Sequence, residues 1–332
     1  MRRLVTTGVG IVISIGLLYW VLRKPSLAEI MTHLREARPG PLIVAVVVAT
    51  STFAVRVIRW RYLLRTDRDQ PVSWRALWHA TAMGFMANNT LPFRLGELLR
   101  SYAASRLGGV PLTAAISSIA VERALDGLTL VGLLGFALLR AGLPADTMIL
   151  GSRLDVVAVR AGILCAVIFA AAVFVVAFPR AAERIIRALV PLRRLADRLV
   201  TLVDGIRLGF GALRSPGRLT MAVVWSLVHW ILNGAAFYIA FAAFGIQVDF
   251  AGALLVQSLL AFGIAAPSTP GYFGVFEFVV AAALALFGVP RDLGVAYGIT
   301  FHIATFIPIV LLGLWSLART GLHVRDAAEA RR

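Results

Sequence analysis

Charged and amide side chains stand beside prolines in two apolar stretches of this sequence, in patterns that could bind an anion. The first group belongs to the segment Asn88-Asn89-Thr90-Leu91-Pro92-Phe93-Arg94-Leu95-Gly96-Glu97-Leu98-Leu99-Arg100. A helix that begins just after Pro92 would have Arg94 in its first turn, beside free backbone N–H groups and the positive end of the helix dipole. Such a helix start binds anions. Glu97 lies three residues from Arg94 and from Arg100 and could pair with either. The alternative is an ordinary cytoplasmic loop whose charges are solvated.

The next apolar stretch carries three charged residues near its middle, Glu122, Arg123 and Asp126. At the centre of a membrane helix each ionised side chain costs about 2.5 to 3.5 kcal/mol, so three cost roughly 8 to 10 kcal/mol. Glu122 and Asp126 are one turn apart and face the same way, so we expect this face to point into the bundle, where nearby arginines neutralise it. A purely structural ion network is the alternative, because buried ion pairs do not by themselves prove function.

A second broken stretch supplies a similar group in Pro267-Ser268-Thr269-Pro270-Gly271-Tyr272-Phe273-Gly274-Val275-Phe276-Glu277. Its prolines predict another half-helix start, and its glycines would let a backbone or a ligand approach closely. Glu277 lies in an otherwise apolar run, which makes it a candidate site residue. His229 shares a helix face with Asn233, and His302 shares one with Thr305. Both histidines are more typical of hydrogen bonds between helices than of proton carriers.

The composition of the chain indicates a polytopic membrane protein. It has 332 residues, of which 59% are hydrophobic and 15% charged, with a mean hydropathy of +0.84. The apolar blocks are long enough to cross a hydrocarbon core of about 30 Å as helices, and they lack the alternation of a transmembrane β-barrel. The net charge of +16 would suggest nucleic acid in a soluble protein, but basic cytoplasmic loops explain it here, so we expect no nucleic-acid partner.

The predicted fold is an all-α bundle of about six spanning helices and two re-entrant helix pairs. Full spans are expected near residues 4–22, 40–62, 112–139, 157–178, 218–244 and 293–317. The stretches 74–106 and 250–287 are each broken by the prolines described above, so each reads as two short helices around an unwound segment. Unwound backbone at membrane depth survives only inside protein or against a water-filled cavity.

The organisation predicted for 1–332 is one membrane domain containing an inverted repeat. Pro92, Gly96 and Glu97 recur about 178 to 180 residues later, and each broken stretch lies between two full helices. The units are 40–140 and 218–318, joined through a basic amphipathic cytoplasmic segment, 180–217. This orientation puts 24 basic residues in the cytoplasmic set and eight outside, so both termini are predicted to be cytoplasmic. Inverted repeats with broken helices are typical of transporters, whose sites lie near mid-membrane.

Signatures of enzymes are missing from the sequence. It contains no Gly-x-x-x-x-Gly-Lys phosphate loop, no His-Glu-x-x-His and no Gly-x-Ser-x-Gly. The single cysteine, Cys165, permits no intramolecular disulfide and no cysteine-based metal site. We therefore expect a protein that is not an enzyme, with no catalytic residue, cofactor or metal.

Three motifs together resemble a known family. They are Asn88-Asn89-x-x-Pro92-x-Arg94-x-Gly96-Glu97-x-x-Arg100, Val121-Glu122-Arg123-x-x-Asp126 and Pro270-Gly271-x-x-Gly274-x-x-Glu277. The chain looks like the lysylphosphatidylglycerol synthase transmembrane region, also called the flippase-like or UPF0104 family, over about residues 10–318. The resemblance implies movement of aminoacylated phosphatidylglycerol or lipid-linked sugars across the bacterial cytoplasmic membrane. Some members continue into a cytoplasmic aminoacyltransferase domain; none is expected here, so synthase activity is not carried over.

The function predicted from these observations is a flippase-like transporter of a phospholipid or lipid-linked headgroup. Its partners would be membrane lipids with a phosphate-bearing headgroup; a separate lipid-modifying enzyme and a homo-oligomer remain open. The alternatives are a transporter of a small anionic metabolite and a non-catalytic lipid-binding helper of another enzyme. The expected binding residues are Asn88, Asn89, Arg94, Glu97, Arg100, Glu122, Arg123, Asp126, Pro270, Gly271 and Glu277.

Overall fold

The chain forms a bundle of α-helices in a computed structural model, which confirms the predicted all-α class. The structure describes residues 27–66, 68–91, 95–143, 178–193, 195–197, 215–264 and 270–322, with a few single residues and pairs between 16 and 200. Its helices are α2 (Leu27–Glu36), α3 (Pro39–Leu63), α4 (Trp74–Thr90), α5 (Gly96–Gly108), α6 (Leu112–Arg140), α8 (Pro179–Leu189), α10 (Pro216–Ala243), α11 (Phe250–Gly263), η2 (Pro270–Tyr272), α12 (Val275–Ala285) and α13 (Arg291–Thr320). Two-residue strands, β1 (Met148–Ile149) and β2 (Ser152–Arg153), pair antiparallel.

Three of the described helices are long and apolar enough to cross a membrane, namely α3, α10 and α13. They coincide with the spans expected near 40–62, 218–244 and 293–317. The helix expected at 112–139 is α6, which has 29 residues but carries Glu122, Arg123 and Asp126 at its centre. The remaining two predicted spans, near 4–22 and 157–178, lie almost wholly outside the described residues.

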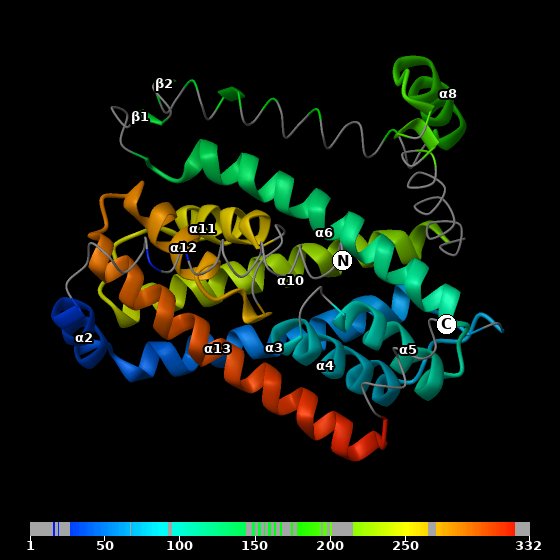
Figure 1. The fold of residues 1–332 in the computed structure, drawn as a ribbon, viewed down its shortest axis with the longest axis horizontal. Coiled ribbons are helices and arrows are strands. Elements are labelled where there is room, and N and C mark those ends of the chain that lie inside the picture. The colour runs from blue at the N-terminus through cyan, green and yellow to red at the C-terminus, as the bar shows by residue number, and fades with distance from the viewer. Residues whose placement is uncertain are drawn as a thin grey trace.

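Both broken stretches form pairs of short helices, as the prolines predict. The first gives α4 and α5, and the second gives α11 and α12 with the short 3-10 turn η2 before α12. Figure 1 shows α4 and α5 toward one end of the bundle and α11 and α12 toward the other. This arrangement suits two pairs that enter a membrane from opposite sides.

The helix contacts have the pattern that a two-fold repeat would produce. Helix α10 packs along α3, and each broken pair contacts the long helix of the other unit, α4 against α13 and α11 against α6. Within each unit the second short helix packs on the long helix that follows it, α5 on α6 and α12 on α13. The two units also begin their helices alike: α3 and α10 have proline in the first turn, and α4 and α11 are capped by the side chains of Ser73 and Asp249. These correspondences favour the predicted repeat.

The two largest hydrophobic cores of the bundle lie in different groups of helices. One surrounds Trp60, Leu77 and Leu99 between α3, α4, α5 and α6, and the other surrounds Phe241 and Tyr297 between α10, α11, α12 and α13. Each core therefore belongs mainly to one unit of the predicted repeat. Because lipid is as apolar as these side chains, close van der Waals packing and interhelical hydrogen bonds stabilise each core.

Helices α4 and α5 pack so closely that only glycine fits at their contact. A Cβ at Gly96 would overlap the carbonyl oxygen of Gly84 and the backbone nitrogen of Asn88, and a Cβ at Gly84 would lie 2.6 Å from the Cβ of Arg100. The two glycines thus allow Arg100 to lie on the inner face of the pair, where its side chain is 3% exposed.

The basic segment predicted at 180–217 begins with the amphipathic helix α8. Arg187 forms an ion pair with Glu183 at 3.1 Å and another with Asp197 at 3.2 Å, while Ile185 on the same helix is exposed. An exposed apolar side chain beside arginines is typical of a helix that lies on a membrane surface. Most of the segment after Val200 is outside the described residues.

Candidate functional site

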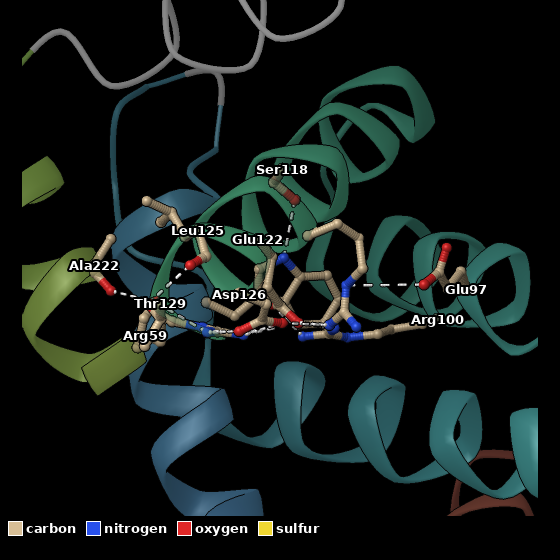
Figure 2. Close-up of polar contacts among 12 residues, drawn as sticks. Arg59, Glu97, Arg100, Ser118, Glu122, Leu125, Asp126, Thr129 and Ala222 are labelled. Carbon is tan, nitrogen blue, oxygen red and sulfur yellow. Dashed lines mark hydrogen bonds and ion pairs between the residues drawn. The ribbon is translucent and has the colours of Figure 1, made fainter. Parts of the chain in front are cut away.

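Five charged side chains from α3, α5 and α6 meet inside the bundle. Glu122 is fully buried, and its carboxylate accepts two hydrogen bonds from Arg100, at 2.7 and 2.9 Å, and one from Arg123 at 2.7 Å. Asp126, one turn further along α6, accepts a hydrogen bond from Arg59 at 2.5 Å and pairs with Arg123 at 3.1 Å. Figure 2 shows Arg59 and Arg100 approaching the two carboxylates from opposite sides. We call these five residues the charge cluster.

Arg59 is the member of the charge cluster that sequence reasoning missed. Its side chain is 0% exposed, bridges Asp126 and Glu122 (3.1 Å), and donates to the Ser226 hydroxyl at 3.0 Å. It lies near the end of the apolar run 40–62 and was assigned to the basic residues of the cytoplasmic side. The packing of α3 against α6 and α10 instead places Arg59 on the buried face, one turn before the end of the helix. The spacing of Thr52, Val55 and Arg59, three and then four residues apart along that face, was the available signal.

The surrounding aromatic residues hold the charge cluster in place. The Arg100 guanidinium lies 3.8 Å from the centre of the Trp60 ring, and Trp60 donates its own N–H to Ser118 at 2.9 Å. On the α10 side, Trp230 donates its Nε1–H to Asp126 at 3.0 Å. Cation–π contacts of this kind contribute about 2 kcal/mol or more when they are desolvated. Asp126 thus has neutral as well as charged hydrogen-bond donors, and Arg100 is held by an aromatic ring as well as by Glu122.

One edge of the charge cluster is open. The Arg123 side chain is 41% exposed, and its Nε lies 3.8 Å from the carboxylate of Glu97, which is 38% exposed. This corrects the expected partner of Glu97: Arg100 pairs with Glu122 instead, because α5 packs on α6 and places Arg100 nearer that carboxylate. The cluster therefore runs from buried Glu122 to an exposed ion pair.

The residues predicted around the first break are only partly placed. Asn88 and Asn89 belong to the last turn of α4, and the Asn88 side-chain oxygen has no hydrogen-bond partner among the described residues. Arg94 lies outside the described residues. The prediction that it occupies the first turn of the following helix therefore stays untested; within the described residues α5 begins at Gly96, with Glu97 in its first turn. The binding role predicted for Arg94 stays a prediction.

Glu277 is buried in the second unit, as predicted, but its partners are different from those of the first. Its carboxylate accepts the backbone N–H of Gly274 at 2.7 Å and lies 2.7 Å from Nδ1 of His302, whose ring stacks on Phe276. His302 follows Glu122 by about 180 residues, the same offset that separates Glu277 from Glu97. In each unit a polar pair that includes a carboxylate therefore links the second short helix to the long helix that follows.

The other residues predicted in the second unit have mixed outcomes. Pro270 and Gly271 form η2, where Gly271 has a φ of 73°, a backbone conformation that favours glycine. The expectation that His302 hydrogen-bonds between helices is confirmed. The same expectation is wrong for His229, because both of its ring nitrogens are buried without a partner among the described residues.

A cavity of about 210 Å³ lies beside the charge cluster. Helices α3, α10, α11, α12 and α13 line it together with Phe85 of α4. Trp230 belongs both to its wall and to the hydrogen bonds of Asp126, and Arg56 reaches its wall from α3, one turn before Arg59. Within the described residues no group of three side chains suited to a metal ion occurs.

Long apolar helices, helices broken at prolines and a buried charge cluster together define a polytopic membrane protein. The chain matches the lysylphosphatidylglycerol synthase transmembrane region over residues 8–313, and it belongs to this family.

Relatives of similar length support this membership. The chain is 24% identical to a UPF0104 membrane protein of Methanothermobacter thermautotrophicus, over 94% of this chain and 92% of that protein. A second UPF0104 membrane protein of the same organism is 23% identical over 86% of this chain and 85% of its own length. The chain is also 25% identical to Glycosyltransferase AglD of Haloferax volcanii, matching 99% of this chain but only 57% of that longer protein.

Proposed function

We propose that this protein moves a phosphate-bearing lipid headgroup across the cytoplasmic membrane while the acyl chains stay in the bilayer. The observation that carries the proposal is the charge cluster beside a cavity in the middle of a membrane bundle. Its members come from three different helices, α3, α5 and α6, so relative movement of these helices would rearrange the ion pairs. Membership of a family named for a lipid-synthase transmembrane region supports a lipid as the substrate.

The balance of charge around the cluster fits an anionic ligand. Four arginines lie in or next to the charge cluster: Arg59, Arg100 and Arg123 belong to it, and Arg56 lies beside it. The carboxylates that face them are Glu97, Glu122 and Asp126. This set has one positive charge in excess. A purely structural network would need no excess, whereas a site for one phosphate does, because desolvated charges in a membrane are paired.

The arginines also follow one another from the open edge to the cavity. Arg123 is partly exposed, Arg59 is buried next to it across Asp126, and Arg56 lies one turn along α3 at the cavity wall. A phosphate that enters beside Arg123 could next bind the guanidinium groups deeper in the bundle, each of which offers paired N–H donors. Exchange of partners along this row would let a headgroup cross without passing through hydrocarbon as an unpaired charge.

In this proposal the protein is a transporter and not an enzyme, and it needs no cofactor. The proposal includes cytoplasmic termini and a cytoplasmic α8, because that orientation puts most of the basic residues on the cytoplasmic side. A lipid-binding helper of a separate enzyme is the second candidate, and the AglD relative favours it. That relative's name denotes a glycosyltransferase, and this chain matches only part of its length.

The proposal is tested with purified protein reconstituted into vesicles that contain phosphatidylglycerol with a fluorescent acyl chain. Dithionite added outside destroys the label in the outer leaflet only, so translocation appears as additional loss in vesicles that hold protein. The expected result is protein-dependent loss without leakage of a trapped soluble dye. Uptake of soluble glycerol phosphate without lipid movement would instead favour a metabolite transporter, and binding of lipid without any movement would favour the helper.

A further inference from the structure

The cavity beside Arg56 is lined by two buried polar atoms without a hydrogen-bond partner, one a donor and the other an acceptor. Nη1 of Arg56 is a donor with no acceptor, and Oε1 of Gln257 is an acceptor with no donor, among the described residues. Both side chains line the cavity. A buried unpaired polar atom costs about 1 to 3 kcal/mol, and one in a charged group costs more. Two such atoms on one cavity wall therefore indicate a ligand that supplies an acceptor and a donor together.

Both atoms are held by contacts that leave them available. The Arg56 guanidinium lies 4.5 Å from the centre of the Phe85 ring, and Arg56 forms no ion pair with a described residue. The other end of the Gln257 amide is fixed, because its Nε2 donates to the carbonyl oxygen of Trp230 at 2.9 Å. This bond orients Oε1 as the free acceptor. The Gln257 residue is only 2% exposed, so water in bulk does not satisfy it.

The rest of the lining is suited to a polyol and not to a cation. Arg56 is the charged residue among the described residues of the lining, and Asn233 and Thr305 add neutral polar groups. Phe276 and Trp230 add aromatic surface. An ammonium group would face the arginine here without a carboxylate to neutralise it, whereas a phosphate would pair with Arg56 and a hydroxyl could donate to Gln257.

The size of the cavity agrees with a small headgroup. Its volume of about 210 Å³ has room for several water-sized groups, and so for a phosphate with a short polyol.

The geometry points to this cavity as a binding site for a polyol-phosphate headgroup, with Arg56 holding the phosphate and Gln257 accepting from a hydroxyl. The site would thus select a lipid such as phosphatidylglycerol over its cationic aminoacyl ester. This inference rests on the proposed function, since it names the class of lipid that the transporter carries. Soluble glycerol phosphate has the same chemistry, so the experiment separates the two sources.

The test measures binding to purified protein in detergent through its thermal unfolding. Four probes are titrated: short-chain phosphatidylglycerol, phosphatidic acid, lysyl-phosphatidylglycerol and soluble glycerol phosphate. Phosphatidylglycerol should bind most tightly, and Arg56→Gln should weaken it about 10- to 100-fold, the effect of losing one charge-assisted hydrogen bond. Gln257→Met should remove the preference for phosphatidylglycerol over phosphatidic acid, which lacks the hydroxyls. Arg218→Gln is the matched control, because Arg218 pairs with Asp69 outside the cavity.

Each outcome decides the inference independently of transport. Tighter binding of lysyl-phosphatidylglycerol, or unchanged binding in a folded Arg56→Gln variant, would overturn it. Soluble glycerol phosphate binding as tightly as the lipid would assign the site to a metabolite and overturn the lipid class. If the vesicle assay shows no lipid movement but phosphatidylglycerol binds through Arg56 and Gln257, the transport proposal fails and the site stands. If lipid moves and neither variant changes its selectivity, the site fails and transport stands.

Discussion

Removing the charge of Glu122 should destabilise the fold more than any comparable change at the open edge of the charge cluster. In Glu122→Gln the side chain keeps its shape, but three arginines lose their shared carboxylate: Arg59, Arg100 and Arg123. One amide N–H₂ would also point at a guanidinium donor. Because Glu122 is fully buried, the unpaired positive charge cannot be hydrated, and breaking such a pair costs about 3 to 5 kcal/mol.

The matched control is Glu97→Gln, which removes the same charge from a partly exposed residue at the open edge of the charge cluster. Its carboxylate is 38% exposed and 3.8 Å from Arg123, so its loss should cost no more than about 1 kcal/mol. The assay heats both detergent-purified variants and measures the protein that stays monodisperse on size exclusion. We expect the midpoint temperature of thermal unfolding to fall far below the wild-type value for Glu122→Gln only. Equal midpoints for the two variants would refute the buried pairing described here.

Three further predictions concern packing, the first break and topology. Gly96→Ala should destabilise the fold by about 1 to 3 kcal/mol or more and lower the yield of folded protein, because the new Cβ would overlap the backbone of α4. Gly135→Ala should leave the yield unchanged, because a Cβ there would contact nothing. Fluorescence-detected size exclusion measures both yields. Arg94→Lys should reduce lipid translocation in vesicles and leave protein abundance intact, and a wild-type rate would show that this arginine has no role. Asp197→Cys in a Cys165→Ser background should not be labelled by a membrane-impermeant thiol reagent in intact cells, since α8 is predicted to be cytoplasmic. Labelling from outside would overturn the orientation.

Local sequence signals were enough to predict most helices. Prolines mark the breaks before α5 and α12, and the apolar runs match α3, α10 and α13 within a few residues, because helix length and hydropathy are local properties. The buried position of Glu122 and Asp126 was also predictable, since their charge in the middle of an apolar helix leaves few other places for them.

Partners across helices were not predictable in the same way. The spacing along the chain allowed Glu97 to pair with Arg94 or Arg100. Because α5 packs on α6, however, Arg100 pairs with Glu122, and Glu97 pairs with Arg123. Arg59 was missed because its role depends on how α3 packs on α6, which a one-dimensional pattern does not contain. The cavity is likewise lined by residues of six helices from different parts of the chain, so no single sequence motif predicts it.

The central claim is that arginines of the charge cluster carry a lipid phosphate across the membrane. The most direct measurement is the rate of headgroup translocation in vesicles, normalised to folded protein, for Arg123→Lys and for the control Arg218→Lys. Lysine keeps the charge but loses the paired donors of the guanidinium, so Arg123→Lys should be at least about tenfold slower than wild type. The control, an arginine that pairs with Asp69 outside the cluster, should keep the wild-type rate. Equal rates for Arg123→Lys and Arg218→Lys would contradict the account.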